Sequence, residues 1–164
     1  MATDAERNFV EKVGLYFEQL SLPRMGGRIF GWLLISDSPQ VSMTELVEVL
    51  QASKSSISSI TRLLIQVDLI EIVSIPGMRR DYYRIRQDVW TNSLRDRLKQ
   101  ATSFRKLADE GLALLKDDPR ERLLRLQEMH LMYAFLEREI PVLMERWEKE
   151  RQAFYESVRK DQRG

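Results

Sequence analysis

Two short segments in the middle of the chain repeat apolar residues every three or four positions, the period of an amphipathic helix. Residues 42–50 carry Leu46, Val49 and Leu50, and residues 53–67 carry Ile57, Ile60, Leu64 and Val67. Ser42, with Glu45 three residues later, forms a capping-box pattern, and Ser53 can cap the second helix. Because only a short turn separates the two segments, the pattern predicts a helix-turn-helix.

A β-hairpin is predicted directly after these helices. Residues 70–75 are rich in β-branched residues, Pro76-Gly77 is a turn pair, and residues 81–86 alternate apolar and polar positions. Arg79 and Arg80 place two adjacent cations at the hairpin tip. A hairpin in this position is the wing of a winged helix-turn-helix, although a basic tip can also serve only to keep a sheet edge soluble.

The polar face of the second helix indicates a nucleic-acid interface. It carries short hydroxyl groups, a guanidinium and the amide of Gln66, and residues 53–67 include no acidic residue. Such groups donate hydrogen bonds to phosphates and to base edges in a major groove. An ordinary solvated helix face is the alternative. The residues predicted to contact DNA are Lys54, Ser55, Ser58, Ser59, Arg62, Arg79 and Arg80.

Two helices are predicted before this region. Thr3 or Asp4 can cap the first helix, whose apolar stripe is Phe9, Val13, Phe17 and Leu20. Pro23 starts the second helix, residues 24–35, which contains Gly26, Gly27 and Gly31. Because glycine lowers helix stability by about 1 kcal/mol relative to alanine, three glycines indicate close backbone approach to a neighbouring helix.

Two long helices are predicted after the wing. Asp88 can start the first helix, Asp117-Asp118-Pro119 ends it and starts the second, and Pro141 should kink or split that second helix. Their apolar stripes exceed what a small winged module can cover, so a second copy of the chain is the expected partner. The chain is therefore predicted to be one unit over residues 1–164. Residues 36–87 would bind DNA, and residues 1–35 and 88–164 would form a helical dimerisation part.

The composition supports a folded protein without an obvious catalytic centre. Apolar residues make up 43% of the chain, charged residues 31%, and the net charge is only +1, so attraction to DNA must come from local clusters. The charged N-terminus and the short apolar run at residues 29–35 predict a cytoplasmic protein that neither carries a signal peptide nor enters a membrane. There is no cysteine, and the single histidine, His130, lies among apolar residues. We therefore expect no catalytic residues, no metal site and no cofactor.

Three stretches carry a resemblance to a known family. They are PRMGGRIFGWLL at residues 23–34, LQASKSSIS at residues 50–58 and GMRRDYY at residues 77–83. The chain resembles MarR-type regulators, and more closely their GbsR-like branch, over residues 6–98. The resemblance implies a dimeric DNA-binding repressor whose fold is mainly α-helical with a small β-hairpin wing and long dimerisation helices. Met78 stands where that branch usually has an acidic residue.

The resemblance also implies a small-molecule effector, since some GbsR-type members respond to choline or related osmolytes. Aromatic rings near the junction of the winged module and the dimerisation helices would suit a quaternary ammonium group. The candidate rings are Tyr16, Phe30, Trp32 and Trp90, and the alternative is that they only fill the core. The sequence thus predicts a homodimeric repressor on double-stranded operator DNA. A winged-helix protein-interaction module without DNA binding is the alternative, and an enzyme is a distant third.

Overall fold

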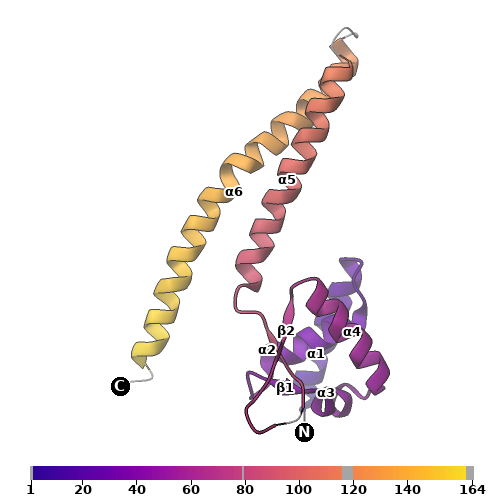
Figure 1. Ribbon diagram of the computed structural model, residues 1–164, viewed down its shortest axis with the longest axis vertical. Helices are drawn as coiled ribbons and strands as arrows, with labels where there is room; N and C mark the ends of the chain where they lie inside the picture. The colour runs from indigo at the N-terminus through magenta and orange to yellow at the C-terminus, as the bar shows by residue number, and fades with distance from the viewer. Residues whose placement is uncertain (1, 79, 116–119, 162–164) are drawn as a thin grey trace. The chain divides into compact units, whose positions relative to one another are not determined.

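A computed structural model of the chain describes residues 2–78, 80–115 and 120–161 and divides it into two compact units, Met1–Val89 and Trp90–Gly164. Both are mainly helical, with one small sheet in the first unit, as expected (Figure 1). The first unit contains α1 (Asp4–Gln19), α2 (Arg24–Ile35), β1 (Val41–Ser42), α3 (Met43–Leu50), α4 (Lys54–Gln66), β2 (Ile70–Val73) and β3 (Tyr82–Ile85). The second is built from α5 (Val89–Leu114) and α6 (Arg120–Asp161).

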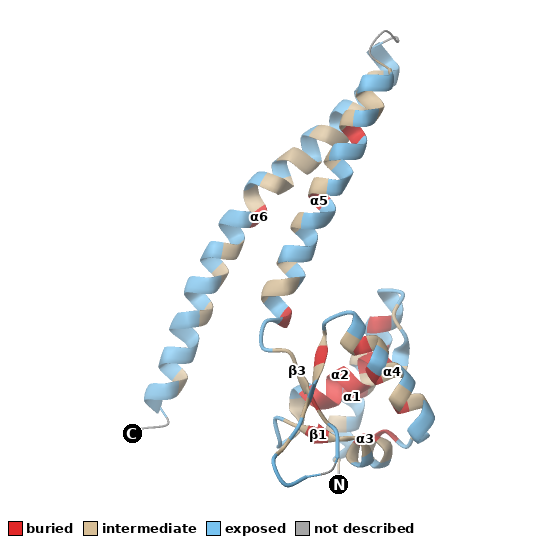
Figure 2. Ribbon diagram, in the orientation of Figure 1, coloured by how far each residue is buried: buried red, intermediate tan, exposed pale blue. Residues whose placement is uncertain are grey.

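The first unit has a continuous apolar core, to which α2, α3, α4 and the sheet all contribute (Figure 2). Ile29, Leu46, Ile57, Leu64 and Ile70 are each at most 1% exposed. Leu46, Ile57 and Leu64 come from the apolar faces that the helical periodicity predicts. Val67, predicted on the same face as Leu64, is 42% exposed, because it lies just past the end of α4. The helix-turn-helix and the hairpin are therefore held as one body.

Glycines in α1 and α2 allow the two helices to approach closely. A Cβ added at Gly27 would lie 2.5 Å from the carbonyl oxygen of Val13 and 2.7 Å from the Cα of Gly14. At Gly31 the nearest atom would be the Cβ of Val13, at 3.1 Å. The predicted close backbone approach is confirmed at Gly27, whereas the nearest atoms at Gly26 belong to side chains.

The predicted apolar stripe of α1 is partly wrong. Val10, Gly14 and Phe17 form the buried face, whereas Phe9 and Leu20 are 40% and 51% exposed. The helix carries apolar residues on two faces, and periodicity alone does not say which face packs within the chain.

Side-chain caps define the helix starts. Thr3 forms a full capping box with Glu6 at the start of α1, and Ser42 and Ser53 accept hydrogen bonds from backbone N–H groups in the first turns of α3 and α4. The capping box predicted at Ser42 is only half formed, because the carboxylate of Glu45 accepts a hydrogen bond from Nε1 of Trp32 at 3.1 Å.

The sheet is antiparallel with strand order β1-β3-β2. Ile70 pairs with Ile85 and Val73 with Tyr82, so the hairpin strands are shorter than the predicted runs. At the turn, the N–H of Met78 donates to the carbonyl of Ile75 at 3.0 Å, and Gly77 has a φ of 83°. This φ requires the conformational freedom of glycine. The two-residue strand β1 was not predicted, because such a short segment has no periodicity.

In the second unit, α5 and α6 are joined by packing and polar contacts. Phe104 stacks on Tyr133 with a centroid separation of 4.9 Å, and Leu126 packs against Gly111. The helix α6 continues through Pro141, so of the two predicted alternatives, a kink or a split, the split is excluded. Figure 1 shows α6 turning away from α5 along its length. The expected helix boundary at Asp117-Asp118-Pro119 lies outside the described residues. Over the described ranges, no helix is both long and apolar enough to cross a membrane.

Candidate nucleic-acid interface

The helix α4 presents its polar face to solvent. Ile57, Thr61 and Leu64 are buried on one side, and Ser55, Ser59, Arg62 and Gln66 are exposed on the other, with Ser58 half-buried between them. Small hydroxyl side chains on an exposed helix leave the backbone accessible to a flat or grooved partner. This is the arrangement expected of a recognition helix.

The N-terminus of α4 is suited to a phosphate group. Ser53 caps the helix by accepting from the N–H of Ser56 at 3.2 Å, and Lys54 is the first helical residue. The first turn contains no acidic side chain. The partial positive charge of the helix N-terminus and the ammonium group of Lys54 therefore act in the same direction.

An open hollow of about 450 Å³ brings the start of α4 together with the wing. Lys54, Ser58 and Arg80, three of the residues predicted to contact DNA, all line this hollow. Its other lining residues are Met43, Thr44, Asp81 and Tyr83. Thr44 was missed by the sequence analysis, although its position just after the cap residue Ser42 places it at a helix start. We call this group of residues the α4–wing hollow.

The cations of the first unit fall into two groups. Arg84 is paired with Glu71 at 2.6 Å, Arg86 with Asp68 at 2.5 Å, and Arg24 and Arg28 both with Glu11.

In contrast, Lys54, Arg62 and Arg80 have no ion pair with any residue that the structure describes. The Nε of Arg62 donates to the carbonyl of Ser58 at 3.2 Å, which holds this side chain along its own helix. Arg79 lies outside the described residues. Arg7 and Lys12 of α1 also have no ion pair in the described part of the chain, so α4 and the wing hold three of the five unpaired cations of the first unit.

The rings proposed for an effector are placed differently from one another. Phe30 is buried in the core with its ring centroid 5.7 Å from that of Phe17, and Tyr16 is 57% exposed. Trp32 is buried and lines a hollow of about 210 Å³ between α1, α2 and α3. Trp90 belongs to the second unit. A cage made of all four rings stays a prediction.

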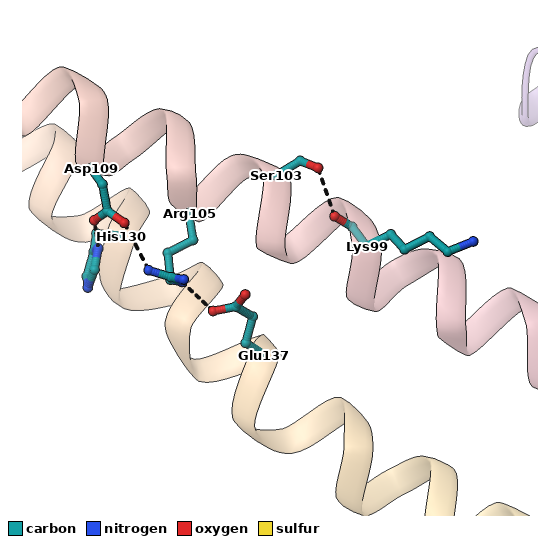
Figure 3. Close-up of polar contacts among 6 residues, drawn as sticks. All are labelled: Lys99, Ser103, Arg105, Asp109, His130 and Glu137. Atoms are coloured by element: carbon teal, nitrogen blue, oxygen red, sulfur yellow. Dashed lines mark hydrogen bonds and ion pairs between the residues drawn. The ribbon is translucent and has the colours of Figure 1, made fainter.

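The single histidine takes part in a polar network between α5 and α6. Nδ1 of His130 lies 2.6 Å from Oδ1 of Asp109, and Figure 3 shows Arg105 between Asp109 and Glu137, to both of which it is ion-paired. The hydroxyl of Thr102, followed by the guanidinium of Arg105, lowers the pKa of Glu137 below its usual range. Over residues 2–78, 80–115 and 120–161, no group of three or more His, Cys, Asp or Glu side chains could hold a metal ion.

A helix-turn-helix followed by a β-hairpin, with unpaired cations on its second helix and on the hairpin, is the arrangement of the winged helix-turn-helix class of proteins. Residues 88–150 match the family described as MmpR5-like MarR family transcriptional regulator. The HTH-type transcriptional regulator MmpR5 of Mycobacterium tuberculosis is 42% identical over 129 residues, which cover 79% of this chain and 78% of the relative. The chain therefore belongs to the MarR family of winged-helix transcriptional regulators. Because these proteins are not enzymes, family membership confirms the expectation of a non-enzymatic protein.

Further relatives agree with this assignment. The putative regulator YvaV and the transcriptional repressor OpcR of Bacillus subtilis are each 29% identical over 86 residues, which cover 52% of this chain and 48% and 46% of those proteins. A solved structure described as the crystal structure of a transcriptional regulator has a TM-score of 0.72 and 38% identity. The match covers 88% of this chain and 99% of that one.

Proposed function

We propose that the protein is a homodimeric repressor that binds double-stranded operator DNA, with α4 in the major groove and the wing along the adjacent backbone. The observation that carries this proposal is the α4–wing hollow, where Lys54, Ser58 and Arg80 converge from two elements. A protein-interaction module without DNA binding would not need unpaired cations on both α4 and the wing.

The two elements have different roles in this proposal. Ser55, Ser59 and Arg62 face outward from α4 and would contact base edges, since a guanidinium and hydroxyl groups can donate to them. Lys54, Arg79 and Arg80 would contact phosphates and fix the position of the module without reading sequence. Thr44, at the start of α3, lies close enough to the same hollow to add a phosphate contact.

Several finer parts of the proposal rest on separate observations. Repression is supported by the name of OpcR, a transcriptional repressor with 29% identity. Placement in the GbsR-like branch rests on the stretches at residues 23–34, 50–58 and 77–83. Control by a small effector would involve Tyr16, Phe30, Trp32 and Trp90, of which Trp32 already lines a hollow. Action on operator DNA implies a cytoplasmic protein.

The salt dependence of DNA binding tests the proposal. An operator should first be obtained by sequencing genomic fragments that the protein retains. Replacing Arg79 and Arg80 with alanine should weaken binding to all DNA alike and lower the slope of log affinity against log salt by about one to two. Arg86→Ala is the matched control, because this wing cation is already paired with Asp68. An unchanged slope in the double variant would show that the wing does not contact phosphates.

The base-reading role of α4 is tested separately with Arg62→Ala. This change should reduce operator affinity by about 1–3 kcal/mol and relax the preference at one base position. Affinity for unrelated DNA should fall less. If specific and non-specific binding fell equally, Arg62 would be a phosphate contact.

A further inference from the structure

Two polar side chains of α2 hold opposite ends of α3. Nη2 of Arg28 donates to the carbonyl oxygen of Leu50, the last residue of α3, at 3.1 Å. One turn further along α2, Nε1 of Trp32 donates to the carboxylate of Glu45, in the first turn of α3, at 3.1 Å. Because residues four apart lie on the same face of a helix, α2 fixes both the position and the direction of α3.

The bond to Leu50 lies directly before the turn of the helix-turn-helix. The cap residue Gln51 has a φ of 49°, in the left-handed region, and α4 begins at Lys54. The last carbonyl groups of a helix have no partner within it, and a guanidinium beside them also interacts favourably with the helix dipole. Arg28 therefore holds the point at which α3 ends and from which the chain enters α4.

Arg28 is itself held from α1. Its Nε lies 2.6 Å from a carboxylate oxygen of Glu11, and its side chain is only 25% exposed. A Cβ added at Gly14 would lie 3.0 Å from Cγ of Arg28, so the missing side chain at Gly14 leaves room for the stem of the arginine against α1. One guanidinium thus connects α1, α2 and α3.

Arg24, one turn before Arg28 on α2, differs from it in a single respect. Arg24 is ion-paired with the same carboxylate, that of Glu11, at 2.9 Å. Among the residues that the structure describes, however, its side chain donates to Glu11 and to no residue of α3. Arg24 therefore supports the contact between α1 and α2, whereas Arg28 also supports the helix-turn-helix.

We propose that Arg28 is a positioning residue for DNA recognition, which sets the orientation of the helix-turn-helix relative to α1. It lines the hollow of about 210 Å³ between α1, α2 and α3 and not the α4–wing hollow, so it acts without a DNA contact of its own. The proposal rests on the proposed dimeric binding of an operator. Since α1 belongs to the proposed dimer interface, the orientation that Arg28 sets determines the distance between the two copies of α4.

The spacing of operator half-sites provides the first test. The affinity of the full chain is measured for its operator and for operators with one base pair inserted or removed between the half-sites. Arg28→Gln should weaken binding to the original operator about five- to hundredfold, because a displaced α4 loses base contacts of this size. It should also reduce the discrimination between the three spacings. A loss of folded protein alone would weaken binding to all three alike.

Arg24→Gln is the matched control, because it removes a partner of Glu11 and leaves the bond to Leu50 in place. Its affinity and its spacing preference should equal those of the parent chain. Arg28→Lys keeps the charge, but one ammonium group cannot occupy the positions of both guanidinium nitrogens. Its spacing preference should lie between those of the parent chain and Arg28→Gln.

Amide hydrogen exchange tests the same contact without DNA. The N–H of Ala52 donates to the carbonyl of Val47 at 3.3 Å, and the N–H of Ile57 to that of Ser53 at 3.0 Å, on the two sides of the turn. Both amides should exchange about two- to tenfold faster in Arg28→Gln than in Arg24→Gln, the range that one hydrogen bond supplies.

Two results would overturn the proposal. The first is a spacing preference of Arg28→Gln equal to that of Arg24→Gln, and the second is equal exchange at the turn in the two variants. If Arg28→Gln does not fold, Arg28→Lys takes its place in both comparisons. A parent chain that binds no DNA would instead contradict the proposed function, and the exchange rates would still decide whether Arg28 holds the turn.

Discussion

At the scale of single residues, the contact between α1 and α2 depends on the absence of one methyl group. The missing Cβ of Gly27 would meet backbone atoms of Val13 and Gly14, which cannot rotate away. Gly26 differs, because its nearest neighbour would be Cδ2 of Leu64 at 3.3 Å, the end of a side chain. Two adjacent glycines in one helix therefore have unequal tolerance to substitution.

Gly27→Ala should lower the free energy of unfolding by about 1–3 kcal/mol, because overpacking exceeds the gain of about 1 kcal/mol in helix propensity. Gly26→Ala should cost clearly less. Denaturant unfolding followed by circular dichroism measures both variants under the same conditions. Equal effects of the two substitutions would show that the helices can move apart without penalty.

A second residue-scale prediction concerns Glu137 and pH. Its pKa in the folded protein is lowered from the usual value of 4.5 by the hydroxyl of Thr102 and the guanidinium of Arg105. A depressed pKa means that the ionised form stabilises the folded state at pH values above 4.5, and that this contribution is lost as pH falls through the folded pKa. Glu137→Gln should therefore be less stable than the parent chain at neutral pH.

The difference between Glu137→Gln and the parent chain should shrink as the pH is lowered below 4.5. Thermal unfolding midpoints recorded over a pH series provide the measurement. Glu145→Gln serves as the control, because Glu145 is exposed and has no partner among the described residues. A pH-independent difference would indicate that Glu137 acts through packing and not through its charge.

At the scale of elements, sequence signals located the helices well where a side chain sets the boundary. Pro23 and the caps Ser42 and Ser53 place the starts of α2, α3 and α4 where they were predicted. The strand β1 was missed because its pairing with Tyr82 and Tyr83 depends on residues about 40 positions away. The same limit applies to Glu45, whose carboxylate binds Trp32 from another helix.

In the candidate site, too, local features were predictable from sequence, whereas contacts between distant segments were not. Exposure of Ser55, Ser59 and Arg62 was predictable from helical periodicity, because opposite faces of a helix are fixed by residue spacing. The winged arrangement predicts that the hairpin tip lies beside the second helix, but the hollow that Lys54 and Arg80 share depends on tertiary packing and required the structure. Which cations are paired also required the structure, as Arg84 and Arg86 look no different from Arg80 in sequence.

A prediction at the scale of elements concerns the effect of Pro141 on the stability of α6. The helix α6 continues through it, although proline lacks the N–H that would bond to the preceding turn. Pro141→Ala restores this donor and should raise the stability of the second unit by about 1–3 kcal/mol, with increased helical circular dichroism. Glu145→Ala is the control for a substitution without a backbone effect. A loss of stability would mean that the local helix geometry at Pro141 supports packing.

At the scale of the whole molecule, the amount of exposed apolar surface calls for a partner. Each unit has apolar side chains that no described residue covers. In the first unit they include Phe9, Tyr16 and Leu20, and in the second unit they include Leu107, Leu131, Met132, Phe135, Leu143 and Phe154. Monomeric proteins rarely leave large areas of apolar surface in water. A second copy of the chain would cover them without requiring any other component.

The proposed dimer places α1, α5 and α6 of each chain in the interface and two copies of α4 about 34 Å apart, which matches half-sites one DNA turn apart. Truncation after Glu139 removes Ile140, Trp147 and Phe154 and should convert the dimer to a monomer. Operator affinity should then fall steeply, because each monomer would contact only one half-site. Native mass and operator binding are measured together on the full and truncated chains. If the full chain has the mass of a monomer at micromolar concentration, the exposed apolar faces have some other partner and the homodimer is excluded.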